Sequence, residues 1–129
     1  MDVETRSQLK ETVRRFVRER LVPLEDKVEE TDEVPAEIRR EMADLGLFGL
    51  SIPVEYGGLG VDLSTEVEIA FELGWTAPAF RSVVGTNIGI GSQGIVIDGT
   101  EEQKQSYLPR LAKGDIVGSF ALTEPDIGS

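Results

Sequence analysis

Residues 89–103 read GIGSQGIVIDGTEEQ, and Gly89–Gly94 fit the spacing G-x-G-x-x-G of dinucleotide-binding folds. In those folds the glycines follow a strand, begin a helix of about ten residues or more, and lead to a second strand that ends in an acidic residue. Here only residues 95–98 follow before Gly99 interrupts the run. A capping box, TEEQ at 100–103, then begins a new helix. The spacing therefore argues against a dinucleotide site at these glycines and favours a helical fold.

The glycines of this stretch have a simpler explanation as small residues on one helix. Gly85, Gly89 and Ser92 fall near helical spacing, and small side chains let another helix or a ligand approach closely. Packing against a helix and lining a ligand both remain open from these residues alone.

Helical periodicity continues toward the N-terminus. The first predicted helix carries one apolar stripe, and Pro23 is expected to kink it near Leu21. A second helix begins at Pro35 and is capped by Gly46. The stripes of the two helices contain Leu9, Val13, Phe16, Val17, Leu21, Leu24 and Val28, and then Ile38, Met42 and Leu45.

Further helices follow the glycine-punctuated loop at residues 47–60. Asp62 or Ser64 is expected to cap a third helix, whose apolar side contains Val67, Ala70 and Phe71. The helix that begins at Thr100 is expected to point Tyr107, Leu108 and Leu111 inward and to stop near Gly114, with Pro109 kinking or shortening it. We therefore predict an all-α fold of about five or six helices with an extended C-terminal segment.

Composition restricts the function further. The net charge of −11 argues against a nucleic-acid partner, which needs a basic face. The chain has no Cys and no His, so disulfides, zinc sites and Cys-His or Ser-His nucleophile pairs are excluded within it. The sequence holds no apolar run of about 18 residues and no secretory signal pattern. We expect a cytoplasmic protein that neither spans a membrane nor holds a metal ion.

The last residues differ from the rest of the chain. IVGSFALTEPDIGS, residues 116–129, has no charge from Ile116 to Thr123 and alternates as a strand does. A single strand has no partner in an otherwise helical chain. We therefore expect a helical domain at 1–115, and at 116–129 the opening strand of a second domain that the chain does not complete.

Several stretches taken together resemble the acyl-CoA dehydrogenase family. SIPVEYGGLG (51–60) is similar to the family's proline-and-glycine loop, and residues 85–115 resemble its glycine-rich helix followed by G-T-E-E-Q-K and Y-L-P-x-L-A-x-G. FALTEPDIGS (120–129) resembles the first flavin-binding motif, usually F-A-L-T-E-P-x-A-G-S-D, with Ile127 in place of alanine. The resemblance covers the N-terminal helical domain and the first strand of the middle β-domain.

The resemblance implies an FAD-dependent oxidation of an acyl-CoA thioester to the 2,3-enoyl-CoA. It implies no catalytic residue in this chain, because the family's catalytic glutamate lies in a C-terminal domain, and the fragment alone is expected to be inactive. Glu124 is expected to brace a turn rather than to act as a base. The resemblance assigns cofactor contacts to Phe120, Ala121, Leu122, Thr123, Gly128 and Ser129.

The resemblance also implies a substrate side. Ser129 would approach the substrate as well as the FAD, and Thr86 and Ile90 would lie on the acyl-facing side of the glycine-rich helix. Ordinary helix packing competes with an acyl pocket as the role of Thr86 and Ile90.

Partners follow from the same resemblance. An electron-transferring flavoprotein is the implied electron acceptor, and the parent protein would be a homo-oligomer, either a tetramer or a dimer. Two alternatives stay open. One is an acyl-CoA oxidase or a flavin monooxygenase on the same fold, and the other is a non-enzymatic helical domain for acyl ligands or assembly.

Overall fold

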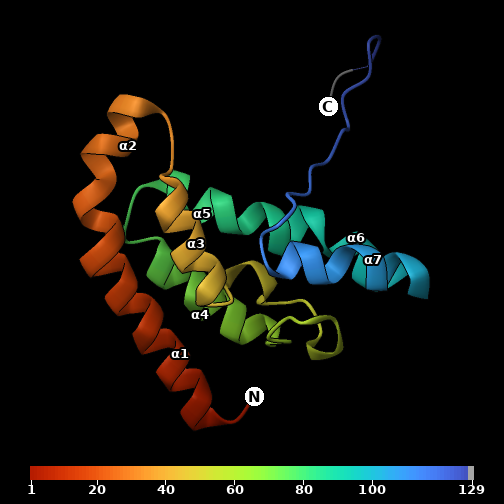
Figure 1. The fold of residues 1–129 in the computed structure, drawn as a ribbon, viewed down its shortest axis with the longest axis horizontal. Helices are drawn as coiled ribbons and strands as arrows, with labels where there is room; N and C mark the ends of the chain where they lie inside the picture. Colours follow the sequence, from red (N-terminus) through yellow and green to blue (C-terminus); the bar gives the residue numbers. More distant parts are fainter. Residues whose placement is uncertain (128–129) are drawn as a thin grey trace.

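The computed structural model describes residues 1–127, and its regular structure is helical throughout (Figure 1). Consecutive helical segments join end to end into five rods, which confirms the prediction of an all-α domain with about five or six helices. The rods cover residues 3–31, 36–44, 63–73, 78–98 and 101–112.

The first rod changes its helical type around Pro23. It contains α1 (Val3–Phe16), a π-helical turn (Val17–Leu21), a 3-10 turn (Val22–Leu24) and α2 (Glu25–Thr31). Proline lacks the N–H that an α-helix needs, so the backbone loosens before it and tightens around it. The irregularity therefore lies where the sequence predicts a kink.

Helix α3 (Ala36–Asp44) is followed two residues later by Gly46, whose φ of +73° is left-handed and confirms the predicted cap. The chain then makes two 3-10 turns, Leu47–Gly49 and Val54–Tyr56. The loop between Gly49 and Val61 folds back on itself through backbone bonds from Leu59 N to Gly49 O (2.8 Å) and from Val61 N to Leu50 O (2.8 Å).

Within this loop Gly58 lies against the backbone of Ile52. A β-carbon at position 58 would lie 2.0 Å from the Ile52 carbonyl oxygen. That oxygen also accepts a hydrogen bond from Gly60 N at 2.9 Å. The glycine is therefore required by close backbone approach.

Helix α4 (Leu63–Leu73) begins at Asp62, whose carboxylate accepts from Thr65 N at 2.8 Å and so confirms the predicted cap. This bond and one from the Ser64 hydroxyl lower the pKa of Asp62 to about 2. The buried side of α4 holds Ile69 and Leu73.

Three side chains that the periodicity places with the core lie at the surface instead. The exposed fractions are 45% for Val67, 72% for Phe71 and 45% for Tyr107. An apolar stripe wider than its partner surface leaves its margin in water, so periodicity alone assigned these residues to the wrong side.

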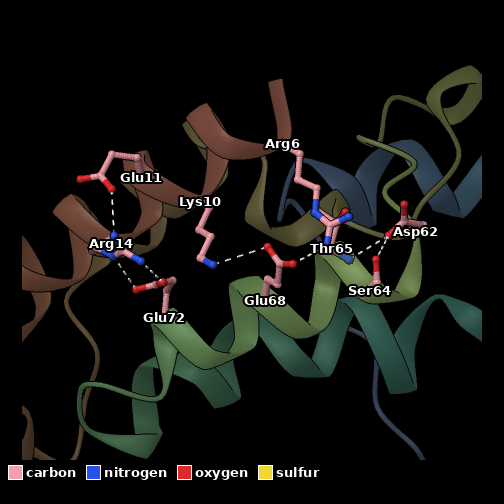
Figure 2. A network of polar contacts seen from close by, with 9 residues as sticks. All are labelled: Arg6, Lys10, Glu11, Arg14, Asp62, Ser64, Thr65, Glu68 and Glu72. Atoms are coloured by element: carbon pink, nitrogen blue, oxygen red, sulfur yellow. Dashed lines mark hydrogen bonds and ion pairs between the residues drawn. The ribbon is translucent and has the colours of Figure 1, made fainter. Parts of the chain in front are cut away.

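Helices α1 and α4 are joined by ion pairs (Figure 2). Arg14 holds Glu72 through two nitrogens at 3.1 and 2.7 Å, and Glu68 receives both Arg6 and, at 3.6 Å, Lys10. The Arg14 guanidinium holds the pKa of the Glu72 carboxyl below its usual range. These charges lie on the margin of the buried contact between the two helices.

The fourth rod, residues 78–98, is called the glycine-rich helix below. It consists of α5 (Pro78–Gly85), a π-helical turn (Thr86–Gly91) and α6 (Gln93–Asp98). The last rod is α7 (Glu101–Ala112), and its capping box is complete: Thr100 and Gln103 each bond the other's backbone N–H. Pro109 lies inside α7, which continues past it to Ala112, so the helix is not shortened at the proline.

The apolar core forms two clusters. The larger joins α1, α3, α4, α5 and the 3-10 turn at Leu47–Gly49, and the smaller joins α7 to Ile52. Phe80, Leu21, Ile38, Met42, Leu47, Ile69 and Leu108 are among the fully buried side chains. No helix within residues 1–127 is long and apolar enough to cross a membrane.

Candidate functional site

The candidate site begins where α7 ends and the chain turns toward its C-terminus. Gly114 adopts a left-handed φ of +73°, and its N–H bonds the Leu111 carbonyl at 3.0 Å. A β-carbon at Gly114 would lie 2.7 Å from the Phe48 ring. Residues 116–127, called the C-terminal segment below, then leave the helical body as the dark blue trace of Figure 1.

Asn87 ties the C-terminal segment to the glycine-rich helix. Its side chain is fully buried, and its Nδ2 donates to the carbonyls of Leu111 (3.1 Å) and Ile116 (3.0 Å). Its Oδ1 accepts from the Gly118 N–H at 3.1 Å. One amide thus adds a hydrogen bond to a carbonyl near the end of α7 and holds the first residues of the segment.

The segment and the helix cross at two glycines. A β-carbon on Gly118 would lie 2.3 Å from the Gly91 α-carbon, and one on Gly91 would lie 3.0 Å from the Gly118 α-carbon. Neither Gly89 nor Gly94 has another atom within 4 Å of such a β-carbon, and Gly85 has only the end of Arg81 at 3.8 Å. Close approach between the helix and the segment is therefore made by Gly91, whereas Gly85 and Gly89 meet no other backbone within the described residues. The alternative that Gly85 and Gly89 line a ligand stays a prediction.

The π-helical turn also fastens the glycine-rich helix to the loop at residues 47–60. The Ile88 carbonyl accepts from the hydroxyls of Ser51 and Ser92, both at 3.0 Å. Gln93 Nε2 reaches the Ser51 hydroxyl at 3.0 Å. The loop and the helix, which are separate motifs in the sequence, are thus joined by hydrogen bonds through Ser51.

The predicted cofactor residues lie on the C-terminal segment just beyond the crossing. Phe120 is 69% exposed and Leu122 is 57% exposed, and Ala121 and Thr123 are exposed as well. None of the hydrogen bonds among residues 1–127 involves the backbone of residues 120–123. The segment forms no strand within the described residues, where it has no partner strand to pair with. Its assignment as the opening strand of a second domain stays a prediction.

A turn follows these residues, where Glu124 N donates to Ile127 O at 3.1 Å. Glu124 takes part in this turn through its backbone. Gly128 and Ser129, assigned to the cofactor and, for Ser129, to the substrate, lie outside the described residues.

The predicted substrate residues lie on the π-helical turn, near the crossing. Ile90 directly precedes Gly91 and is 61% exposed. The Thr86 hydroxyl donates to the Ser82 carbonyl at 2.9 Å. The predicted substrate residues on the helix and the predicted cofactor residues on the segment therefore lie on either side of the crossing of Gly91 with Gly118.

Glu66 of α4, the helix next to the glycine-rich helix, has a shifted pKa. Burial raises the pKa of Glu66, and a hydrogen bond with Ser51 partly opposes the shift. Glu66 and Arg81 help to line a cavity of about 50 Å³ between α4 and the glycine-rich helix. This volume has room for little more than water, so the cavity is too small for an acyl chain.

Sequence reasoning missed Asn87 and Gly118, the residues that build the junction. A usable signal exists for Asn87: it is one of two side-chain amides, with Gln93, in the uncharged run from Ser82 to Ile97, and a buried amide needs bonded partners. Its partners lie 24 to 31 residues further along the chain, which no local pattern indicates.

Comparison with known proteins gives a consistent result. The sequence model described as "Acyl-CoA dehydrogenase, N-terminal domain" matches residues 3–115. An acyl-CoA dehydrogenase of Bacillus subtilis (strain 168) is 36% identical over 94% of this chain and 32% of its own length. The acryloyl-CoA reductase (NADH) of Anaerotignum propionicum is 41% identical over 97% of this chain and 32% of its own length. The chain thus spans about a third of the length of these curated relatives.

Solved structures show the same similarity in three dimensions. A glutaryl-CoA dehydrogenase from Mycobacterium smegmatis in complex with FADH2 superposes with a TM-score of 0.84, at 38% identity over 100% of this chain and 33% of that one. An acyl-CoA dehydrogenase complexed with FAD from Bacillus anthracis gives a TM-score of 0.83, at 33% identity over 98% of this chain and 22% of that one. A chain from work on the electron transferring flavoprotein of Acidaminococcus fermentans gives 0.86, at 30% identity over 99% of this chain and 34% of that one.

Proposed function

The chain belongs to the acyl-CoA dehydrogenase family, and on this premise we propose that it is the helical part of an FAD-dependent enzyme that oxidises an acyl-CoA thioester to the 2,3-enoyl-CoA. The observation that carries the proposal is the exposed segment at Phe120–Thr123, whose backbone makes no hydrogen bond within residues 1–127. A flavin ring needs donors that are not already engaged, and this segment offers them beside the glycine-rich helix.

The residues of the segment fit a flavin in kind. The backbone N–H groups of Leu122 and Thr123 and the Thr123 hydroxyl are donors for the edge of the isoalloxazine ring. Such donors stabilise negative charge that develops on a bound group, as in an oxyanion hole. Phe120 supplies an exposed aromatic face beside them.

FAD would supply the redox chemistry by accepting a hydride from the β-carbon of the substrate. This chain's residues would hold and tune the cofactor, and the base that removes the α-proton would come from outside residues 1–129. Gly128 and Ser129 complete the proposed set, as small and hydroxyl-bearing neighbours for phosphate groups and for the substrate.

The acyl chain is proposed to run along the π-helical turn past Ile90 and Thr86. Ile90 is 61% exposed, so packing within residues 1–127 leaves most of its surface uncovered. An exposed aliphatic side chain next to the flavin segment suits an acyl tail. The Thr86 hydroxyl, bonded to its own helix, would contribute its methyl group to the same surface.

A second candidate runs the reaction in the opposite direction. The relative at 41% identity is named an acryloyl-CoA reductase that uses NADH. The same arrangement would then deliver a hydride from reduced flavin to an enoyl-CoA. For the oxidative direction we propose an electron-transferring flavoprotein as the acceptor, a kind of protein that is named with one of the similar structures.

Absorbance of the full-length natural gene product tests the proposal. A flavin band that bleaches when acyl-CoA is added without oxygen supports the oxidation. A band that bleaches only with NADH and recovers with enoyl-CoA supports the reductase. A purified protein with no flavin band, before or after incubation with FAD, overturns both.

A further inference from the structure

We propose that Asn87 and the crossing of Gly91 with Gly118 form an anchor that fixes the direction in which the C-terminal segment leaves the helical body. The anchor thereby positions Phe120–Thr123 for the flavin. This inference rests on the proposed function for its purpose, while the anchoring itself can be measured without a cofactor.

The bonds of Asn87 point to the segment more than to the core. Of its three partners, the Ile116 carbonyl and the Gly118 N–H belong to the C-terminal segment, and only the Leu111 carbonyl belongs to α7. The Asn87 side chain is fully buried, and its bonds to the segment are partly buried. A residue that served the helical core alone would find its partners within the helices.

Ser92 shows what such a core residue looks like on the same helix. It is also fully buried, but its hydroxyl bonds the Ile88 carbonyl one turn earlier, at 3.0 Å. Ser92 touches no residue of the segment through a hydrogen bond. It is therefore a matched control for Asn87.

The glycine crossing fixes the segment sterically. Because a β-carbon on Gly118 would lie 2.3 Å from the Gly91 α-carbon, the two backbones are in direct contact. The bond from Gly118 N to Asn87 Oδ1 prevents the segment from lifting away. The chain at Gly118 is thus held both by contact and by hydrogen bonding.

The fixed point lies close to the proposed flavin residues. An extended chain advances about 3.5 Å per residue, so Phe120 begins about 7 Å from Gly118. Over so short a length the orientation at Gly118 sets the orientation of the next few peptide groups. A segment that wanders instead would spend only a fraction of its time in the binding direction, and the apparent Kd for FAD would rise by the inverse of that fraction.

The test uses the full-length natural gene product. It compares Asn87→Leu and Gly91→Ala with the control variants Ser92→Ala, Gly89→Ala and Gly94→Ala. Gly89 and Gly94 belong to the same glycine motif but have open space where a β-carbon would go. Hydrogen exchange of the apoprotein is followed by mass spectrometry in a peptide covering residues 116–123, and the Kd for FAD is measured by fluorescence quenching.

We expect Asn87→Leu and Gly91→Ala to speed exchange in the 116–123 peptide, with α4 and α7 still protected, and to raise the Kd for FAD by about tenfold or more. The three control variants should stay within about twofold of the natural protein in both measurements. If FAD binding is unchanged in Asn87→Leu, or if exchange rises equally in all helices, the residue is only part of the core and the inference is overturned.

The two measurements also separate this inference from the proposed function. If the natural protein binds no FAD, the proposed function fails, and the positioning role for the flavin fails with it. Faster exchange confined to residues 116–123 in Asn87→Leu would still establish the anchor in that case. Unchanged exchange in Asn87→Leu and Gly91→Ala would refute the anchor whether or not FAD binds.

Discussion

Gly58→Ala tests whether the loop at residues 47–60 is held by backbone contact. The new β-carbon would lie 2.0 Å from the Ile52 carbonyl oxygen and 2.6 Å from the Ile52 β-carbon. Ordinary contact begins at 3.4 Å, so the two strands of the loop must separate by about 1.4 Å. Ile52 is fully buried and cannot retreat freely.

That displacement would break the bond from Gly60 N to Ile52 O, now 2.9 Å. A buried carbonyl left without its partner costs about 1–3 kcal/mol, and forcing an extra carbon into a packed site costs a similar amount. We therefore expect Gly58→Ala to lower the free energy of unfolding by about 2–5 kcal/mol. For a domain of this size, at about 3–5 °C per kcal/mol, the melting temperature would fall by about 6–25 °C.

The neighbouring Gly57 is the control for backbone strain without contact. Its φ is +84°, and no atom lies within 4 Å of a β-carbon there. Gly57→Ala should therefore cost only about 1 kcal/mol, from the left-handed conformation alone. Thermal and urea denaturation followed by circular dichroism at 222 nm measures both variants. A Gly58→Ala protein within about 1 kcal/mol of the natural one, or no more affected than Gly57→Ala, would refute the reasoning.

Three further predictions concern the core, a cap and an ion pair. Phe80→Ala should cost about 3–5 kcal/mol of unfolding free energy, because Phe80 is fully buried. Phe71→Ala, at a site 72% exposed, should change the unfolding free energy by about 0.5 kcal/mol or less. Equal effects of the two variants in urea denaturation would contradict the assignment of Phe80 to the core and Phe71 to the surface. Thr100→Ala should cost about 1 kcal/mol by removing the cap of α7, and Ser106→Ala, at an exposed position inside the same helix, serves as its control in thermal melts. Glu72→Gln should lower the urea midpoint at pH 7, and more than the outer Glu11→Gln does. Because the folded pKa of Glu72 lies below its ordinary value of 4.5, the stabilisation is present above pH 4.5 and is lost as the pH falls through the folded pKa. The gap between Glu72→Gln and the natural protein should therefore narrow below pH 4.5, and a gap that stays constant down to pH 2 would refute this account.

Features that depend on neighbouring residues were predictable from the sequence. The capping box at Thr100 and Gln103, the cap at Asp62 and the left-handed Gly46 each involve groups within a few residues of one another. The absence of a dinucleotide fold at Gly89–Gly94 followed from the same local logic, because the helix begins again at Thr100.

Features set by distant partners were not predictable. Periodicity gives a helix an apolar side but not its limits, so Phe71 and Tyr107 were assigned inward although no element covers them. Gly91 matters because Gly118, on another element, crosses it. The proposed roles of Phe120–Thr123, Thr86 and Ile90 came from resemblance, and they stay predictions until a flavin is bound.

The ion pairs between α1 and α4 do not by themselves fix how the two helices are aligned along their length, so the apolar side chains must do so. Cations recur at Arg6, Lys10 and Arg14, and acids at Glu68 and Glu72, both at intervals of four residues. If α1 slid along α4 by four residues, about 6 Å, Arg14 would come opposite Glu68 and a charge match would survive.

The charges therefore determine which side of α1 faces α4. They hardly discriminate between positions of α1 along the axis of α4. The distinction must come from shape, through buried apolar side chains such as Val13 of α1 and Val17 just after it, which are 0% and 1% exposed in a closely packed core. Truncating these two side chains would remove the steric constraint while leaving every charge in place. Helix α1 would then dock on α4 in more than one alignment.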